Sequence, residues 1–110
     1  MPGMSTLKLF TPAGNSVTLA ATTTSDRVTV PLVTDSAVPG VENLSLLITN
    51  LGPDNVYIEL AASSATAVVL TSLPVIAGQY ILIKRKAHTS IAGICPTSTA
   101  TVVFTPGDGA

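Results

Sequence analysis

The chain has 110 residues, of which 46% are hydrophobic and only 10% are charged, and its net charge is −1 with a pI of about 5.5. This length suits one compact domain, and the near-neutral charge excludes a general electrostatic attraction to nucleic acid or anionic lipid. The low charge also excludes a solvated disordered chain, and it favours a surface partly covered by partner proteins over the alternative, a merely Thr/Ser-rich or secreted domain.

The first part of the chain predicts three short strands. Residues 1–5 carry neither a basic region nor a long apolar stretch, so we expect a flexible end and no secretory signal. Strands are expected over residues 6–10, 17–23 and 27–33, where β-branched residues favour a pleated sheet over a helix. Pro31 cannot donate to a neighbouring strand, so the third strand should lie at a sheet edge or carry a bulge. Such an edge either pairs with another chain or is protected.

The clearest alternation lies between residues 44 and 60. In residues 44–49 and 56–60 every second side chain is apolar, so each segment predicts a strand with one face in the core. Residues 50–55 between them, Asn-Leu-Gly-Pro-Asp-Asn, are typical of a chain reversal. We therefore expect a β-hairpin here.

The second half predicts a loop and then further strands. Residues 61–67, Ala-Ala-Ser-Ser-Ala-Thr-Ala, are small and uncharged, and we expect a loop there, with a turn of helix or a close contact surface as alternatives. Strands are expected over residues 67–70, 79–85, 90–95 and 99–105, divided by turns that contain Gly or Pro. A flexible tail is expected over residues 106–110.

These segments together predict an all-β fold. They give about nine short strands and no helical stretch long enough to connect parallel strands. We expect one domain over residues 1–110, an antiparallel β-sandwich of eight or nine strands that is jelly-roll-like or immunoglobulin-like.

The sequence carries no arrangement typical of an enzyme. A Ser-His-Asp triad would need His88, the only histidine, which we expect in a solvated turn, and no Gly-x-Ser-x-Gly motif precedes a helix. The acidic residues are expected as turn formers or solvated positions, with Glu59 on the outer face of its strand. We therefore predict no enzyme and no catalytic residue. The acidic residues are Asp26, Asp35, Glu42, Asp54, Glu59 and Asp108.

Cofactor and metal sites are not expected either. Cys95 is the only cysteine, so it forms no disulfide within the chain and no CxxC site, and we expect it to be a small buried hydrophobe. One histidine and one cysteine do not make a zinc site, and no spacing of acids matches a calcium loop. The basic cluster Lys84, Arg85 and Lys86 is expected in a solvated turn, with an acidic partner or a nucleic-acid strand as weaker alternatives.

The second half of the chain resembles small virion proteins of tailed bacteriophages. The resemblance runs over residues 48–109 and rests on the Asn50-Leu51-Gly52 turn, the segment from Pro74 to Gly78, and a closing strand that ends in Thr-Pro-Gly-Asp-Gly. It does not extend to the first 45 residues. These motifs consist of turn chemistry, and in such phages the small β-sandwiches are often decoration or cement proteins of the capsid.

The resemblance implies a non-enzymatic virion structural protein that bridges and stabilises shell subunits. The implied location is the capsid surface, after synthesis in the host cytoplasm. The implied partners are the major capsid protein or other virion proteins, together with further copies of the chain in a dimer or trimer, and neither nucleic acid nor membrane. The alternative is a receptor- or carbohydrate-binding module of a tail or fibre, although the chain has no Trp and few aromatic residues for stacking on sugars.

Overall fold

The regular elements are all strands in this computed structural model, which describes residues 10–32 and 45–108. The strands are mostly short, and the two longest, β4 and β9, lie next to each other. In chain order they are β1 (Thr11–Pro12), β2 (Val17–Ala21), β3 (Asp26–Thr29), β4 (Ser45–Pro53), β5 (Val56–Ala61), β6 (Leu73–Val75), β7 (Tyr80–Lys84), β8 (Ser90–Ile94) and β9 (Ala100–Asp108).

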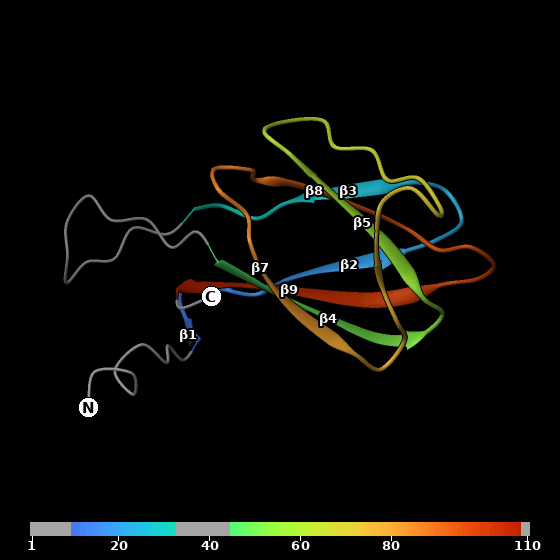
Figure 1. The fold of residues 1–110 in the computed structure, drawn as a ribbon, viewed down its shortest axis with the longest axis horizontal. Helices are drawn as coiled ribbons and strands as arrows, with labels where there is room; N and C mark the ends of the chain where they lie inside the picture. Colours follow the sequence, from blue (N-terminus) through green and yellow to red (C-terminus); the bar gives the residue numbers. More distant parts are fainter. Residues whose placement is uncertain (1–9, 33–44, 109–110) are drawn as a thin grey trace, which may run out of the picture.

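The strands form two antiparallel sheets that pack against each other (Figure 1). In sheet A, β1 and β2 pair with successive parts of β9, and β4 and β7 follow, which gives the order β2-β9-β4-β7. Sheet B has the order β3-β8-β5-β6. The chain changes sheet at nearly every connection, and this order is that of a jelly roll and not that of an immunoglobulin domain. The predicted all-β sandwich is therefore confirmed.

The core lies between the sheets and follows the alternation read from the sequence. On β4 the side chains of Leu46 and Ile48 are fully buried, and opposite them on β9 lie Pro106 and Phe104. On β5 the inward residues are Val56 and Ile58, as predicted. The buried core cluster is completed by residues from other strands and from the adjoining loops: Leu19, Ala21, Val30, Val75, Ile91, Cys95, Ala100 and Val102.

The expected hairpin over residues 44–60 is wrong. β4 and β5 belong to different sheets, so Asp54 and Asn55 connect the two layers instead of two neighbouring strands. Of the residues expected in the turn, Asn50 to Pro53 belong to β4 instead. β4 continues to Pro53, its register against β9 shifts between Asn50 and Pro53, and Gly52 has a φ of 81°, which favours glycine.

Three further expectations changed. The strand predicted over residues 67–70 is part of a loop, because Leu70 has a φ of 67° and the chain turns at residues 69–71. The short strand β6, which contains Pro74, was not predicted. The tail expected from residue 106 is strand as far as Asp108, which pairs with Thr11.

Two predictions near the first half of the chain have different outcomes. β3 is an edge strand of sheet B and ends shortly before Pro31, so the edge position inferred from that proline is confirmed. The strand expected over residues 6–10, the flexible end at 1–5, and the acids Asp35 and Glu42 fall almost entirely outside the described residues.

Candidate interaction surface

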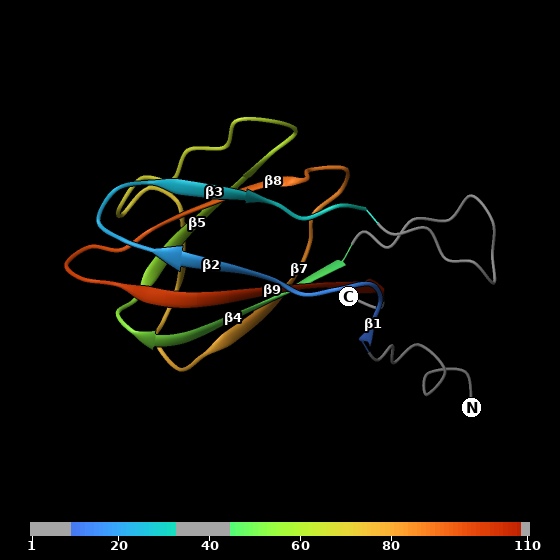
Figure 2. The same cartoon turned by 180° about the vertical axis from the view of Figure 1, so that it is seen from behind.

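The outer face of sheet B is covered by the chain's own loop over residues 62–72. In both views this connection between β5 and β6 lies on the side of β5 and β8 that faces away from sheet A (Figures 1 and 2). Ala65 and Ala67 are buried on Ala92 of β8, and Ile94 packs against the same cluster. The small side chains predicted as a loop or close contact surface therefore allow this loop to lie flat on the sheet.

Two serine hydroxyls fix the loop to the body of the protein. The Ser90 hydroxyl on β8 accepts a hydrogen bond from the backbone N–H of Ala65 at 3.0 Å. The Ser25 hydroxyl, in the connection between β2 and β3, accepts one from the N–H of Ala67 at 2.9 Å. Because these bonds satisfy loop backbone groups that are removed from water, the loop is a fixed cover on sheet B.

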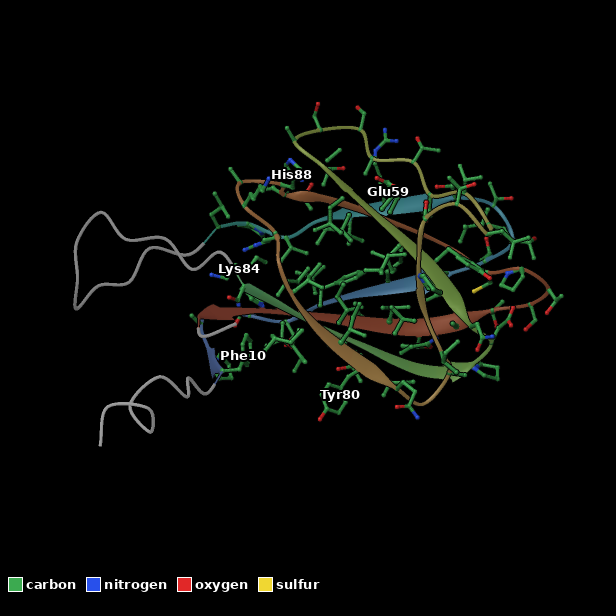
Figure 3. All side chains as sticks on the ribbon, viewed as in Figure 1. Phe10, Glu59, Tyr80, Lys84 and His88 are labelled. Carbon is green, nitrogen blue, oxygen red and sulfur yellow. The ribbon has the colours of Figure 1, made fainter. Side chains whose placement is uncertain are left out.

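The outer face of sheet A carries large apolar side chains. Leu47 on β4 is the register partner of Leu82 on β7, and Thr49 on β4 lies opposite Tyr80 on one side and Val103 on the other. Tyr80 is 69% exposed and Leu82 is 39% exposed. In Figure 3 the Tyr80 side chain points away from the sandwich, on the side opposite Glu59 and the covering loop.

We call this the open face. It consists of those outward-facing residues of four adjacent strands that are exposed or half-buried: Thr18, Ala20, Leu47, Thr49, Leu51, Tyr80, Leu82, Lys84, Thr101, Val103 and Thr105. Lys84, at one end, is its one charged residue among the residues that the structure describes. Contiguous apolar patches with so little charge are unusual on free monomers and mark interaction sites. The open face is therefore the candidate functional surface.

The basic cluster next to this face is only partly solvated. Lys84 and Lys86 are exposed, but Arg85 is 1% exposed, so the expected solvated turn is wrong for Arg85. Its guanidinium donates to the backbone carbonyls of Val30 and Pro31, the latter at 2.8 Å, and burial lowers the pKa of Arg85. Arg85 therefore joins the β7–β8 turn to the chain after β3 and is not available to an acidic partner.

The opposite end of the sandwich is held together by Asp54. One carboxylate oxygen accepts hydrogen bonds from the backbone N–H of Thr97 at 3.0 Å and of Ser98 at 2.8 Å, and the other accepts one from Asn55 at 2.8 Å. The bonds from Ser98 and Thr97 lower the pKa of Asp54. Asp54 thus connects the β4–β5 and β8–β9 turns, which confirms its prediction as a turn former.

Asn50 connects a third turn to the same end. It is fully buried, and its side-chain amide donates to the carbonyls of Asp54 and Val75, both at 2.9 Å, while its oxygen accepts from the N–H of Gly52 at 2.8 Å. The Asn50 backbone also pairs with Gly78 and Gln79 in the β6–β7 turn. This end of the molecule is therefore a closed network of backbone and side-chain hydrogen bonds rather than an open ligand site.

The remaining predicted residues that the structure describes do not gather into a site. Cys95 is buried, as expected, and burial and the Asp54 charge raise its pKa. The Glu59 carboxylate accepts from the Ser72 hydroxyl at 3.0 Å on the outer face of sheet B. His88 lies in the β7–β8 turn (Figure 3), and among the described residues no hydrogen bond joins its ring to a hydroxyl or a carboxylate.

Within residues 10–32 and 45–108, no group of three or more His, Cys, Asp or Glu side chains is placed to hold a metal ion. The same ranges contain no helix long and apolar enough to cross a membrane.

Comparison with known proteins returned no relative. No protein-family model matches the chain, and searches of curated proteins and of solved structures found no significant match. The resemblance to phage virion proteins therefore stays a prediction from the sequence.

Proposed function

We propose that the chain is a non-enzymatic structural protein of a phage particle, a decoration or cement protein that binds shell subunits through the open face. The observation that carries this proposal is the contrast between the two outer faces. Loop 62–72 lies on sheet B and leaves only its own Val68 and Leu70 as exposed large apolar side chains there. Sheet A has no such loop from the described chain over its half-buried Leu47 and Val103 and its exposed Tyr80 and Leu82.

The chemistry of the open face suits a broad protein contact. A strongly charged partner would leave its own charges unpaired against Thr, Val and Leu, which is costly when water is excluded. A weakly polar protein surface meets no such penalty and gains from burial of apolar area. The fold agrees with this use because jelly rolls occur in viral capsid domains, but they also occur in lectins and enzymes, so the site and not the fold supports the proposal.

Substitution on the open face tests the proposal. Thr101 lies on β9 with its side chain exposed on the open face, so Thr101→Lys should leave the core intact while it places a charge in the contact. Thr66→Lys is the matched control, because Thr66 is exposed on loop 62–72, on the other side of the molecule. Purified chain is added to phage shells that lack it, and the shell-bound fraction is measured by co-sedimentation.

We expect Thr101→Lys to weaken shell binding at least about tenfold, since one charge buried without a partner costs more than 1.4 kcal/mol. Thr66→Lys should bind like the wild type. Absence of the chain from purified particles by immunogold labelling would contradict the proposal, and so would equal binding by the two variants.

A carbohydrate-binding module is less well supported. Sugar sites favour exposed aromatic rings in a group. Phe104 is buried in the core, Tyr57 is half-buried on sheet B, and Phe10 is half-buried near β1, so Tyr80 stands alone on the open face. Reproducible binding on a glycan array that is lost in Tyr80→Ala would favour this alternative over a shell contact.

A further inference from the structure

We propose that two copies of the chain pair through the free edge of β7 to form a symmetric dimer. The proposal concerns the purified chain, so it stands or falls separately from the proposed role on a shell. In the part of the chain that the structure describes, β7 (Tyr80–Lys84) is paired on one side only, with β4. It carries no proline, no bulge and no inward-pointing charge, three of the features that protect edge strands, and its one charge, Lys84, lies at its last position with the side chain exposed.

The hydrogen-bond pattern identifies which backbone groups of β7 are free. The N–H of Asn50 donates to the carbonyl of Gln79, so the backbone of Asn50 faces β7. The backbone N–H and C=O groups of successive residues in a strand point alternately toward the neighbouring strand on one side and on the other. The backbone groups of Ile48 and Leu46 therefore also point toward β7 and bond with their partners Ile81 and Ile83. The N–H and C=O groups of Tyr80, Leu82 and Lys84 must then point away from β4, toward the open edge.

These three residues form a self-complementary set. In an antiparallel pair centred on Leu82, Leu82 lies opposite Leu82 of the second copy, and Tyr80 lies opposite Lys84 at each end. All three positions are of the hydrogen-bonded type in this register, so each free donor meets a free acceptor. A shift by one residue would place these groups opposite positions whose own groups already bond to β4.

The side chains agree with the same register. Leu82 meets its own copy, and each Lys84 ammonium lies beside the ring of a Tyr80 instead of beside another Lys84, which permits a cation–π contact and avoids repulsion. Tyr80 and Lys84 are exposed in the single chain and therefore accessible. A two-fold axis perpendicular to the sheet would join the two open faces into one continuous surface on the same side of the dimer.

The other edges are poorer candidates. β3 carries Asp26 and Arg27, and β6 has only three residues, one of them Pro74. β2 has no charge, but by the same alternation only Thr18 and Ala20 direct their backbone groups outward, and their side chains are small. β7 therefore offers the longest run of free groups with the largest apolar side chains.

A proline substitution can remove the pairing at the edge of β7 without unfolding the chain. Leu82→Pro removes an N–H that points outward, so it should keep the bonds between β4 and β7 and remove the central pair of the dimer. Thr18→Pro is the matched control, because it makes the same change on the competing edge of β2. Sedimentation velocity over a concentration series measures the dimer, and far-UV circular dichroism checks that each variant is folded.

We expect the wild type to dimerise reversibly, Leu82→Pro to raise the dissociation constant about 30-fold through the loss of two hydrogen bonds, and Thr18→Pro to leave it unchanged. The proposal is overturned if the wild type stays monomeric up to about 0.5 mM, a concentration at which even a weak specific dimer is populated. It is also overturned if Thr18→Pro, and not Leu82→Pro, dissociates the dimer.

A charge exchange tests the register without proline. Tyr80→Lys places two lysines opposite each other at both ends of the pair and should weaken the dimer. Adding Lys84→Glu to it restores an opposite-charge pair in the same register, so the double variant should regain dimerisation at low salt. If Tyr80→Lys and the double variant dissociate equally, the pairing of Tyr80 with Lys84 is wrong.

Discussion

Asn50 lies where β4 leaves its regular pairing, and at this buried position a polar side chain satisfies three backbone groups at once. Removing the amide would leave the carbonyls of Asp54 and Val75 and the N–H of Gly52 without these partners. A buried group that loses its partner costs about 1–3 kcal/mol. A single polar side chain therefore joins the irregular end of β4, the β4–β5 turn and the end of β6.

We predict that Asn50→Ala lowers the free energy of unfolding by about 3 kcal/mol, because several buried groups are affected together. Urea unfolding followed by far-UV circular dichroism measures this. Asn15→Ala is the control, since Asn15 is exposed, and it should change the stability by less than about 0.5 kcal/mol. Equal stability of the two variants would show that the Asn50 network contributes nothing.

Arg85 shows what residue types alone could not predict. Three basic residues in a row at the end of a strand read as a solvated turn, and Lys84 and Lys86 follow that rule. Arg85 is buried because the carbonyls of Val30 and Pro31, far away in the sequence, converge on its guanidinium. No local pattern contains that information, whereas the hydrophobic environment expected for Cys95 could be read from its own neighbours.

At the scale of elements, alternation predicted the faces of the strands better than their pairing. The inward residues of β4 and β5 were identified correctly, because burial of every second residue is a local property. Their placement in different sheets was missed, since the same Gly, Pro and Asn residues build a hairpin or a crossing between layers. β6 was missed because it is short and contains Pro74, which argues against a strand.

The open face could be predicted only in part. The outward positions of Leu47, Leu82 and Val103 follow from the period of their strands. Which sheet would be covered by residues 62–72 does not, because that depends on how the loop folds back onto Ala92. The alanines of that loop were a signal of close packing but did not identify the surface on which they pack.

Packing between β8 and β2 depends on the lack of a side chain at Gly93. A Cβ atom there would lie 2.8 Å from Leu19 Cδ2 and 3.3 Å from Val56 Cγ2. We predict that Gly93→Val destabilises the fold by about 1–3 kcal/mol through overpacking. Leu19→Ala should cost about 2–5 kcal/mol of stability in the wild type. In the Gly93→Val chain it should cost at least about 1 kcal/mol less, because the space left by the leucine accommodates the added valine side chain.

The control for this cycle is Leu46→Ala, which removes a buried side chain that is not among the nearest neighbours of Gly93. Its cost should add to that of Gly93→Val within about 0.5 kcal/mol. Chemical denaturation of the four chains of each cycle provides the measurement. If the stability costs of Leu19→Ala and Gly93→Val were also additive, the two sheets would not be tightly packed at this point.

The hydrogen bonds that join the turns to the Asp54 carboxylate should make the stability of the fold depend on pH. Hydrogen bonds from Ser98 and Thr97 lower the pKa of Asp54 below its usual value of 3.8, so the folded state favours the charged carboxylate. This contribution is present at neutral pH and is lost as the pH falls from about 4 through the lowered folded-state pKa.

We therefore predict that the difference in stability between the wild type and Asp54→Asn is largest above pH 5 and shrinks toward pH 2. Thermal unfolding of both chains across this range, at constant ionic strength, measures the difference. A constant difference at every pH would show that the charge of Asp54 plays no part in joining the two turns.

For the whole molecule, the sparse charge predicts a contact that salt does not weaken. The open face has Lys84 as its one charge in the described chain, so screening has little to act on. We predict that the bound fraction on phage shells is the same at about 0.1 M and about 1 M NaCl, because burial of apolar area does not depend on attraction between charges. A steep loss with salt, measured by co-sedimentation, would indicate that charged residues such as Lys86 make the contact instead.

The loop fixed over sheet B limits the stacking of further copies of the chain on a bound layer. In the proposed contact of the open face with a shell, loop 62–72 lies on the side that faces outward. Its Ala65 and Ala67 are buried against Ala92, whereas its Val68 and Leu70 are 49% and 84% exposed. A following copy would find no second apolar sheet on which to stack. For the proposed role on a shell, we therefore expect the bound protein to stop at a monolayer whatever the concentration of free chain, because single exposed side chains offer less apolar area than a sheet face.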